Sequence, residues 1–234
     1  MNSSLYELLT KLLSTEESKN PAFNYLLNDY AKYHYAMVIL GGLSCIALAI
    51  LSISQFNRLR ISRSFISHLK TTRGKASLYL SSLSGVLAIS LGLILIGNLG
   101  NALNPRAGFK NSLDMLGNPS PGTKTAHLQQ SYVNWIQSEK STVPNYVTQV
   151  INERISWQLP KALICALLLV VFVYLSRLVW EQLLRENANI KGRHAQGLFL
   201  AGIFLSFITL LLLIMSIANA QGSIAPVSLS LFFA

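Results

Sequence analysis

Four long blocks of apolar residues limit what this 234-residue chain can fold into. A helix needs about 20 mostly apolar residues to cross the hydrocarbon core of a bilayer, and each block is long enough. The blocks cover about residues 35–56, 77–99, 157–180 and 195–218. None has an ionisable residue at its centre, and Lys161 and Arg177 lie near the ends of the third, where long side chains reach the headgroups. The sequence therefore predicts an all-α membrane protein with four transmembrane helices.

The basic residues are concentrated in the two short loops that join these blocks, in a chain whose formal net charge is +10. The first loop, 57–76, contains no acidic residue and carries Arg58, Arg60, Arg63, Lys70, Arg73 and Lys75. The second loop, 181–194, carries Arg185, Lys191 and Arg193. An excess of Lys and Arg in short loops marks the cytoplasmic side of a membrane. We therefore predict cytoplasmic loops, with the N-terminus, the middle segment and the C-terminus outside the plasma (inner) membrane of a bacterium.

This distribution also bears on the partners of the chain. Basic loops beside transmembrane helices interact with anionic lipid headgroups, which explains the basic character without a nucleic acid. We predict contact with the lipid bilayer and no nucleic-acid partner.

Three further segments are predicted to be amphipathic helices outside the membrane. In residues 4–17, leucines recur at helical spacing, and Ser4 with Glu7 fits a capping box. Asn20 followed by Pro21 predicts a break and a new helix. Two more apolar stripes lie in the middle segment, the first formed by Leu128, Tyr132, Trp135 and Ile136 and the second by Val147, Val150, Ile151 and Ile155. The second stripe is expected to continue into the third span. The tail, 219–234, is too short to cross again, so it lies in the interface or packs on the bundle.

The two halves of the chain resemble each other at a constant offset of 121 residues (146 − 25). At this offset Lys19, Asn24 and Tyr25 fall on Lys140, Asn145 and Tyr146, and Pro105 falls on Pro226. The alternative is coincidence, because membrane helices have a low sequence complexity, and the register fails where Pro21 falls on Thr142. We predict two parallel pseudo-repeated hairpins, in residues 1–113 and 122–234, joined by a linker at 114–121. Parallel repeats are related by an axis along the membrane normal.

Small residues at three- and four-residue spacing indicate where the helices pack. Small side chains let helix backbones approach closely, which is how membrane helices associate when lipid provides no hydrophobic drive. The candidate packing residues are Gly41, Cys45, Ser81, Gly85, Ala88, Gly92, Gly202, Ser206 and Thr209. A polar pore lining is the alternative interpretation of the same residues.

The sequence contains no recognisable catalytic motif. The four histidines, His34, His68, His127 and His194, do not stand near Cys, Asp or Glu at ligand spacing, so no metal site is predicted. Acidic pairs that could serve general acid–base chemistry are missing from the apolar blocks. We predict no cofactor and no enzymatic activity.

Aromatic and cationic side chains outside the membrane are the best candidates for recognition. Residues of these types dominate the energetics of protein interfaces, and the candidates are Trp135, Tyr146, Arg154 and Trp157. The alternative is that they only seat helices on the bilayer, where Trp157 and Trp180 would bracket the third span. The expected function is a scaffold or accessory subunit of a larger envelope membrane complex, with other membrane subunits or further copies as partners. A small oligomeric channel or transport component, and an envelope sensor or immunity protein, are the alternatives.

Overall fold

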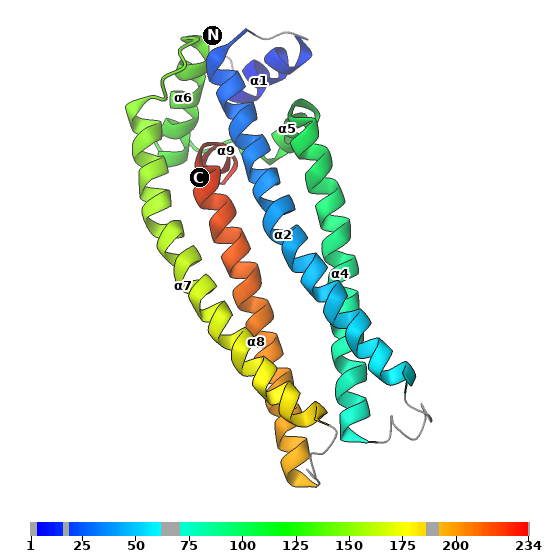
Figure 1. Cartoon of the computed structure of the whole chain (residues 1–234). Coiled ribbons are helices and arrows are strands. Elements are labelled where there is room, and N and C mark those ends of the chain that lie inside the picture. The colour runs from blue at the N-terminus through cyan, green and yellow to red at the C-terminus, as the bar shows by residue number, and fades with distance from the viewer. Residues whose placement is uncertain (1–3, 16–18, 62–70, 186–191, 234) are drawn as a thin grey trace. The chain divides into compact units, whose positions relative to one another are not determined.

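The computed structural model describes residues 4–15, 19–61, 71–185 and 192–233, and every regular element in these ranges is a helix (Figure 1). Four of the helices are long and apolar enough to span a membrane. They are α2 (Pro21–Ile61), α4 (Thr72–Leu103), α7 (Asn145–Leu184) and α8 (Arg193–Ile224). The prediction of an all-helical chain with four helices that could span a membrane is confirmed for the described residues. The centres of the two predicted basic loops, 62–70 and 186–191, lie outside the described residues, and so does Glu17.

The shorter elements are α1 (Leu5–Ser14), α5 (Pro105–Ser112), the 3₁₀ helix η1 (Leu113–Met115), α6 (Lys124–Gln137) and α9 (Pro226–Phe232). The capping box predicted for the first helix is present: the Glu7 backbone N–H donates to Ser4 Oγ, and the Ser4 N–H donates to the Glu7 carboxylate. The predicted restart is also confirmed, since Asn20 Oδ1 accepts from the Phe23 N–H at the start of α2.

The long helices are longer than the apolar blocks that predicted them. Helix α2 has 41 residues and is therefore about 60 Å long, whereas the hydrocarbon core is about 30 Å thick. Helix α7 has 40 residues and contains Pro160 far from either end. The stripe from Val147 to Ile155 therefore continues into the third span as one helix, as expected. Helix α4 also continues through Gly97, Asn98 and Gly100, and it stops at Leu103, directly before Asn104 and Pro105.

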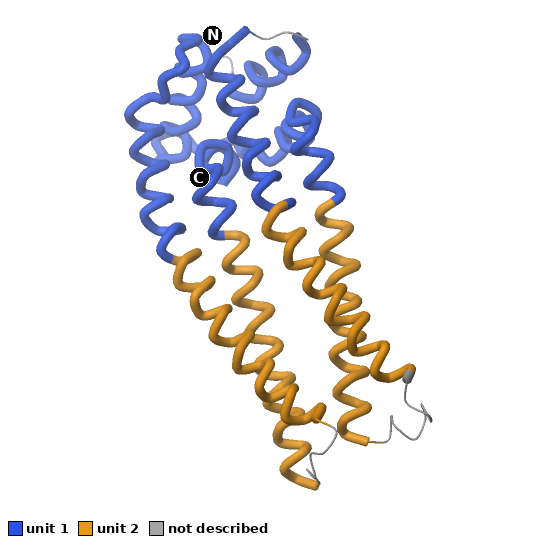
Figure 2. The backbone as a smooth tube through the Cα atoms, in the orientation of Figure 1, with its two compact units in different colours: residues 1–38, 96–160, 219–234 blue, residues 39–95, 161–218 orange. Residues whose placement is uncertain are grey.

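The chain divides into two compact units, coloured separately in Figure 2. Unit 1 comprises residues 1–38, 96–160 and 219–234, and unit 2 comprises residues 39–95 and 161–218. Each predicted half, 1–113 and 122–234, contributes residues to both units. The units and the predicted repeats are therefore different partitions of the chain.

Unit 1 has a hydrophobic core of its own, built from α1, α5, α6, α9 and the parts of α2 and α7 that it contains. Its largest fully buried side chains are Trp135, Tyr132, Phe23 and Phe109. The predicted apolar stripe of α6 is confirmed, because Leu128, Tyr132, Trp135 and Ile136 are all buried. On α7, Val147 and Ile151 are buried, and Val150 and Ile155 pack against this core.

The C-terminal tail forms part of the same core. Val227 and Leu231 of α9 are buried in it, and Ser228 and Ser230 are buried as well. Of the two alternatives for this tail, packing on the protein is the one that the structure adopts. Unit 2 contains the central parts of the long helices, with a second cluster formed by Ala76, Leu80, Trp180, Leu183, Leu184 and Ala195.

Candidate functional site

Within unit 2, α2 and α4 are held together by hydrogen bonds between small polar side chains and the backbone. Ser52 Oγ donates to the Ser81 carbonyl at 2.9 Å, and Ser81 Oγ donates to the Ser52 carbonyl at 3.1 Å. Cys45 Sγ donates to the Ala88 carbonyl at 3.3 Å. Such bonds strengthen contacts between membrane helices, where apolar side chains alone gain little over lipid.

The predicted small residues lie along this contact. A Cβ atom at Gly85 would stand 2.9 Å from Ser52 Oγ, and one at Gly92 would stand 4.0 Å from Cys45 Sγ. Gly41 of α2 is buried too. The sequence analysis predicted Ser81 and Gly85 as packing residues of α4, but it did not predict Ser52, the residue of α2 that contacts both.

The contact between α7 and α8 is centred on Trp180. Its indole Nε1 donates to Ser206 Oγ at 3.2 Å, and its ring stacks on Tyr79 of α4 with 5.8 Å between centroids. Trp180 is only 5% exposed, so its indole packs on protein. The indole is buried because Gly202 leaves room for it: a Cβ there would lie 2.7 Å from the ring. Thr209, the last predicted packing residue, donates its hydroxyl to the Leu205 carbonyl of its own helix.

Replacement of Gly202 by alanine is expected to destabilise the protein by roughly 1–3 kcal/mol, because the added methyl group overpacks a rigid ring. The matched control is Gly197→Ala in the same helix, where no atom lies within 4 Å of the added Cβ. There the higher helix propensity of alanine should leave stability unchanged or raised by up to ~1 kcal/mol. Thermal unfolding in mild detergent measures both. Equal shifts for the two variants would contradict the packing role of Gly202.

A cavity of about 1320 Å³ lies among the four long helices of unit 2. It exceeds the ~300–1,000 Å³ that is usual for small-molecule sites. Its apolar wall is formed by leucines and valine from α2, α4, α7 and α8: Leu48, Leu51, Leu80, Leu83, Leu87, Leu169, Val173, Leu210 and Leu213. Hydroxyl groups also line it, from Ser44, Ser77, Ser84, Ser176, Ser206 and Thr209.

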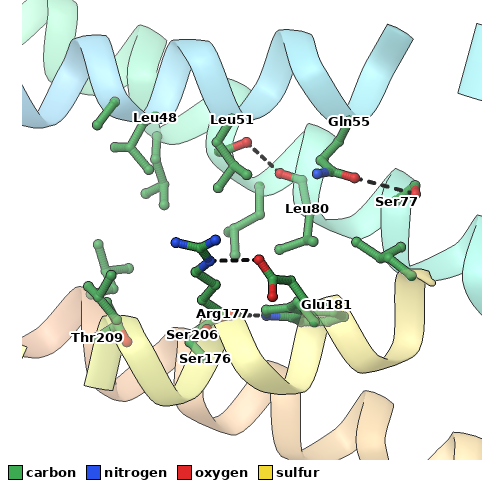
Figure 3. A pocket seen from close by; sticks show the side chains of 18 of the residues that line it. Leu48, Leu51, Gln55, Ser77, Leu80, Ser176, Arg177, Glu181, Ser206 and Thr209 are labelled. Atoms are coloured by element: carbon green, nitrogen blue, oxygen red, sulfur yellow. Dashed lines mark hydrogen bonds and ion pairs between the residues drawn. The ribbon is translucent and has the colours of Figure 1, made fainter. Parts of the chain in front are cut away.

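Charged residues from three segments also line the cavity. They are Arg58 of α2, Arg73 of α4, Arg177 and Glu181 of α7, and Arg185 directly after α7. Arg177 Nε pairs with Glu181 Oε1 at 2.6 Å, with side chains that are 71% and 45% exposed. Figure 3 shows this pair directed from α7 into the cavity, facing Leu51, Leu80 and Gln55. An exposed pair of this kind stabilises a fold little, so its guanidinium is available for another anion.

The four residues predicted to bind a partner have different environments in unit 1. Trp135 is buried, and its indole donates to the Lys140 carbonyl at 2.9 Å. Tyr146 packs against the core, and Arg154 donates through Nη2 to the Phe233 carbonyl at 2.8 Å. Trp157 is 65% exposed. Among the four, Trp157 therefore presents the largest accessible aromatic surface.

Buried polar contacts join the segments of unit 1. The Asp29 carboxylate accepts from the Ser228 backbone N–H at 2.7 Å and from Ser228 Oγ at 2.8 Å. The Tyr132 hydroxyl donates to the Val227 carbonyl at 2.8 Å, and burial raises the pKa of this phenol, which keeps it neutral. His34 Nδ1 lies 2.7 Å from Asn98 Oδ1. These groups link α2, α4, α6 and the C-terminal segment.

Within the described ranges, no group of three His, Cys, Asp or Glu residues is placed to hold a metal ion. His68 lies outside those ranges. Comparison with known protein families, characterised proteins and solved structures finds no significant match to the chain. Unit 2 therefore contains a cavity that both arginines and apolar side chains line.

Proposed function

We propose that the chain is a non-enzymatic integral membrane protein that serves as a scaffold or accessory subunit of a larger envelope membrane complex. The observation that carries the proposal is that the buried polar and aromatic side chains make structural contacts between helices. Asp29, Tyr132 and Trp180 each hold two or more helices together through hydrogen bonds or ring contacts. Groups engaged in this way stabilise the fold: Asp29 and Tyr132 do so in unit 1, and Trp180 does so in unit 2.

Purification in mild detergent after crosslinking tests this function. We expect a stable membrane-protein partner to be recovered, and we expect Trp157→Ala to reduce its recovery, because exposed tryptophans are frequent hot spots of interfaces. The control is Tyr174→Ala, which removes another exposed aromatic side chain from the same helix. Recovery of a lone monomer without a partner would contradict the proposal.

The proposed topology has unit 1 outside the cytoplasmic membrane and the basic ends of the long helices inside. It is supported by Arg58 and Arg60 in the last turn of α2, and by Arg73 and Lys75 in the first residues of α4. Basic residues at these positions favour the cytoplasmic side.

Cysteine labelling in intact cells checks this topology. In a background with Cys45→Ser and Cys165→Ser, we expect an impermeant maleimide to label Asn118→Cys without permeabilisation. Lys75→Cys should react only after the membrane is permeabilised. Both positions are exposed on the protein itself, so a difference reports the side of the membrane. The reverse pattern would show that the orientation is inverted.

We further propose that the chain is a duplicated pair of parallel hairpins. Supporting this, the starts of α4 and α8 are 121 residues apart (193 − 72), and so are their ends (224 − 103). Helices α5 and α9 also start 121 residues apart, each with proline at its first position (226 − 105). The starts of α2 and α7 differ by 124 (145 − 21) and their ends by 123 (184 − 61), so this pair of helices departs from the 121-residue offset by two to three residues. An experimental structure in which α4 and α8 do not superpose in this register would exclude the duplication.

A transport component is the alternative that the cavity of unit 2 favours, because hydroxyl groups line part of it. A pore built between copies from the small-residue faces is less favoured, since Gly85 packs on Ser52 and Ser206 binds Trp180. Solute flux into liposomes that contain the purified protein separates the two functions. Selective flux would favour transport, and its absence would favour the accessory role.

A further inference from the structure

The charged and apolar walls of the cavity lie toward different ends of the same helices. On α7 and the residue that follows it, the lining residues run from Leu169 to Arg185, about 24 Å at the helical rise. The apolar residue Leu169 stands at one end of this run, and Arg177 and Arg185 stand toward the other. On α2, the same order runs from Ser44 and Leu48 to Arg58. The cavity is therefore amphipathic along its length.

We propose that this cavity binds one anionic phospholipid, with the phosphate among the arginines and an acyl chain along the leucines. The inference requires that the four helices span a bilayer. It does not depend on the chain being a subunit of a complex, so the two proposals can fail separately.

The charge of the cavity favours an anion. Four arginines line it, and Glu181 is the acidic residue among the lining side chains. Glu181 already pairs with Arg177 through Nε, and a guanidinium has further N–H donors that can bind two oxygens of a phosphate at once. Basic pockets between membrane helices on the cytoplasmic side suit anionic lipid headgroups.

The apolar wall favours a lipid over a soluble phosphate. Leucines from all four long helices also line the cavity. Inorganic phosphate would bind the arginines but would leave this apolar surface uncovered. On α7, the lined run from Leu169 to Arg177 is about 12 Å long. This is close to the length of one acyl chain, which occupies about half of the ~30 Å hydrocarbon core. A helix of a partner protein would have to bury the arginines against its own surface, which is unfavourable unless it carries matching acids.

Native mass spectrometry of the detergent-solubilised full chain tests the proposal with two dioleoyl lipids, phosphatidylglycerol and phosphatidylcholine. We expect the wild type to bind one phosphatidylglycerol in preference to phosphatidylcholine. The double variant Arg58→Gln, Arg177→Gln should bind phosphatidylglycerol about tenfold more weakly or worse, because it loses charged hydrogen bonds to the phosphate. The matched control is Arg60→Gln, Lys75→Gln, which removes the same amount of charge, from α2 and α4, at positions that do not line the cavity. It should bind as the wild type does.

A second variant tests the apolar wall with all charges intact. Ala47→Phe places a ring among the lining residues and should lower the binding of phosphatidylglycerol, whereas excess inorganic phosphate should not displace the bound lipid. Gel filtration establishes whether each variant is folded. If the double glutamine variant does not fold, the double variant Arg58→Lys, Arg177→Lys replaces it. This variant keeps both positive charges and should keep the preference for the anionic lipid.

Four results would overturn the proposal: equal binding of the two lipids by the wild type, equal losses in the cavity variant and its control, displacement by inorganic phosphate, or a photocrosslinker at Leu213 that captures protein and no lipid.

Discussion

Replacement of Trp180 by alanine is expected to lower the free energy of unfolding by roughly 3 kcal/mol, the lower end of the range for a large aromatic residue lost from a core. The indole stacks on Tyr79, lies against Gly202 and donates to Ser206. Its loss would leave a void among α4, α7 and α8 and would remove the donor that binds Ser206 Oγ. The estimate is at the lower end because lipid, unlike water, gives little hydrophobic penalty for exposed apolar surface.

The same helix provides the control. Trp157 is 65% exposed and also belongs to α7, so Trp157→Ala should change stability by less than about 1 kcal/mol. Unfolding of both variants in mild detergent, followed by circular dichroism, measures the difference. Equal destabilisation would mean that Trp180 does not organise unit 2.

The spans and helix starts could be predicted because they depend on local signals. A long apolar block fixes a membrane helix by composition, and Ser4 with Glu7 caps α1 through contacts three residues apart. Tertiary packing overrode other local signals. Gly97 and Asn98 lie inside α4, where Asn98 binds His34 of α2. Pro160 is accommodated inside α7, although proline removes a backbone donor.

The cavity could not be predicted, because it depends on the rotation of four helices about their axes. Arg177 was interpreted as a residue that extends to the headgroups, and Figure 3 shows that its side chain is directed into the cavity. Small residues indicated that α4 and α8 pack closely, but Ser52 and Trp180, the groups that they contact, carried no recognisable pattern.

Replacement of Asp29 by alanine is expected to release α9 from unit 1 and to lower the free energy of unfolding of that unit by roughly 3 kcal/mol. Asp29 is 5% exposed and accepts two hydrogen bonds from Ser228, 199 residues away in sequence. Hydrogen bonds to a charged group contribute about 1.5–3 kcal/mol each. Removing the buried carboxylate also relieves its desolvation, which offsets part of that loss.

Hydrogen exchange of the α9 amides measures the effect directly, because the Ser228 N–H loses its acceptor in this variant. The graded variant Ser228→Ala keeps the backbone bond and removes only the hydroxyl, so it should cost about 1 kcal/mol. Asp114→Ala removes an exposed carboxylate of the same unit and should leave α9 protected, since surface changes stay within about 0.5 kcal/mol. If α9 remained equally protected in Asp29→Ala, the apolar contacts of Val227 and Leu231 would suffice to hold it, and the carboxylate would serve another purpose.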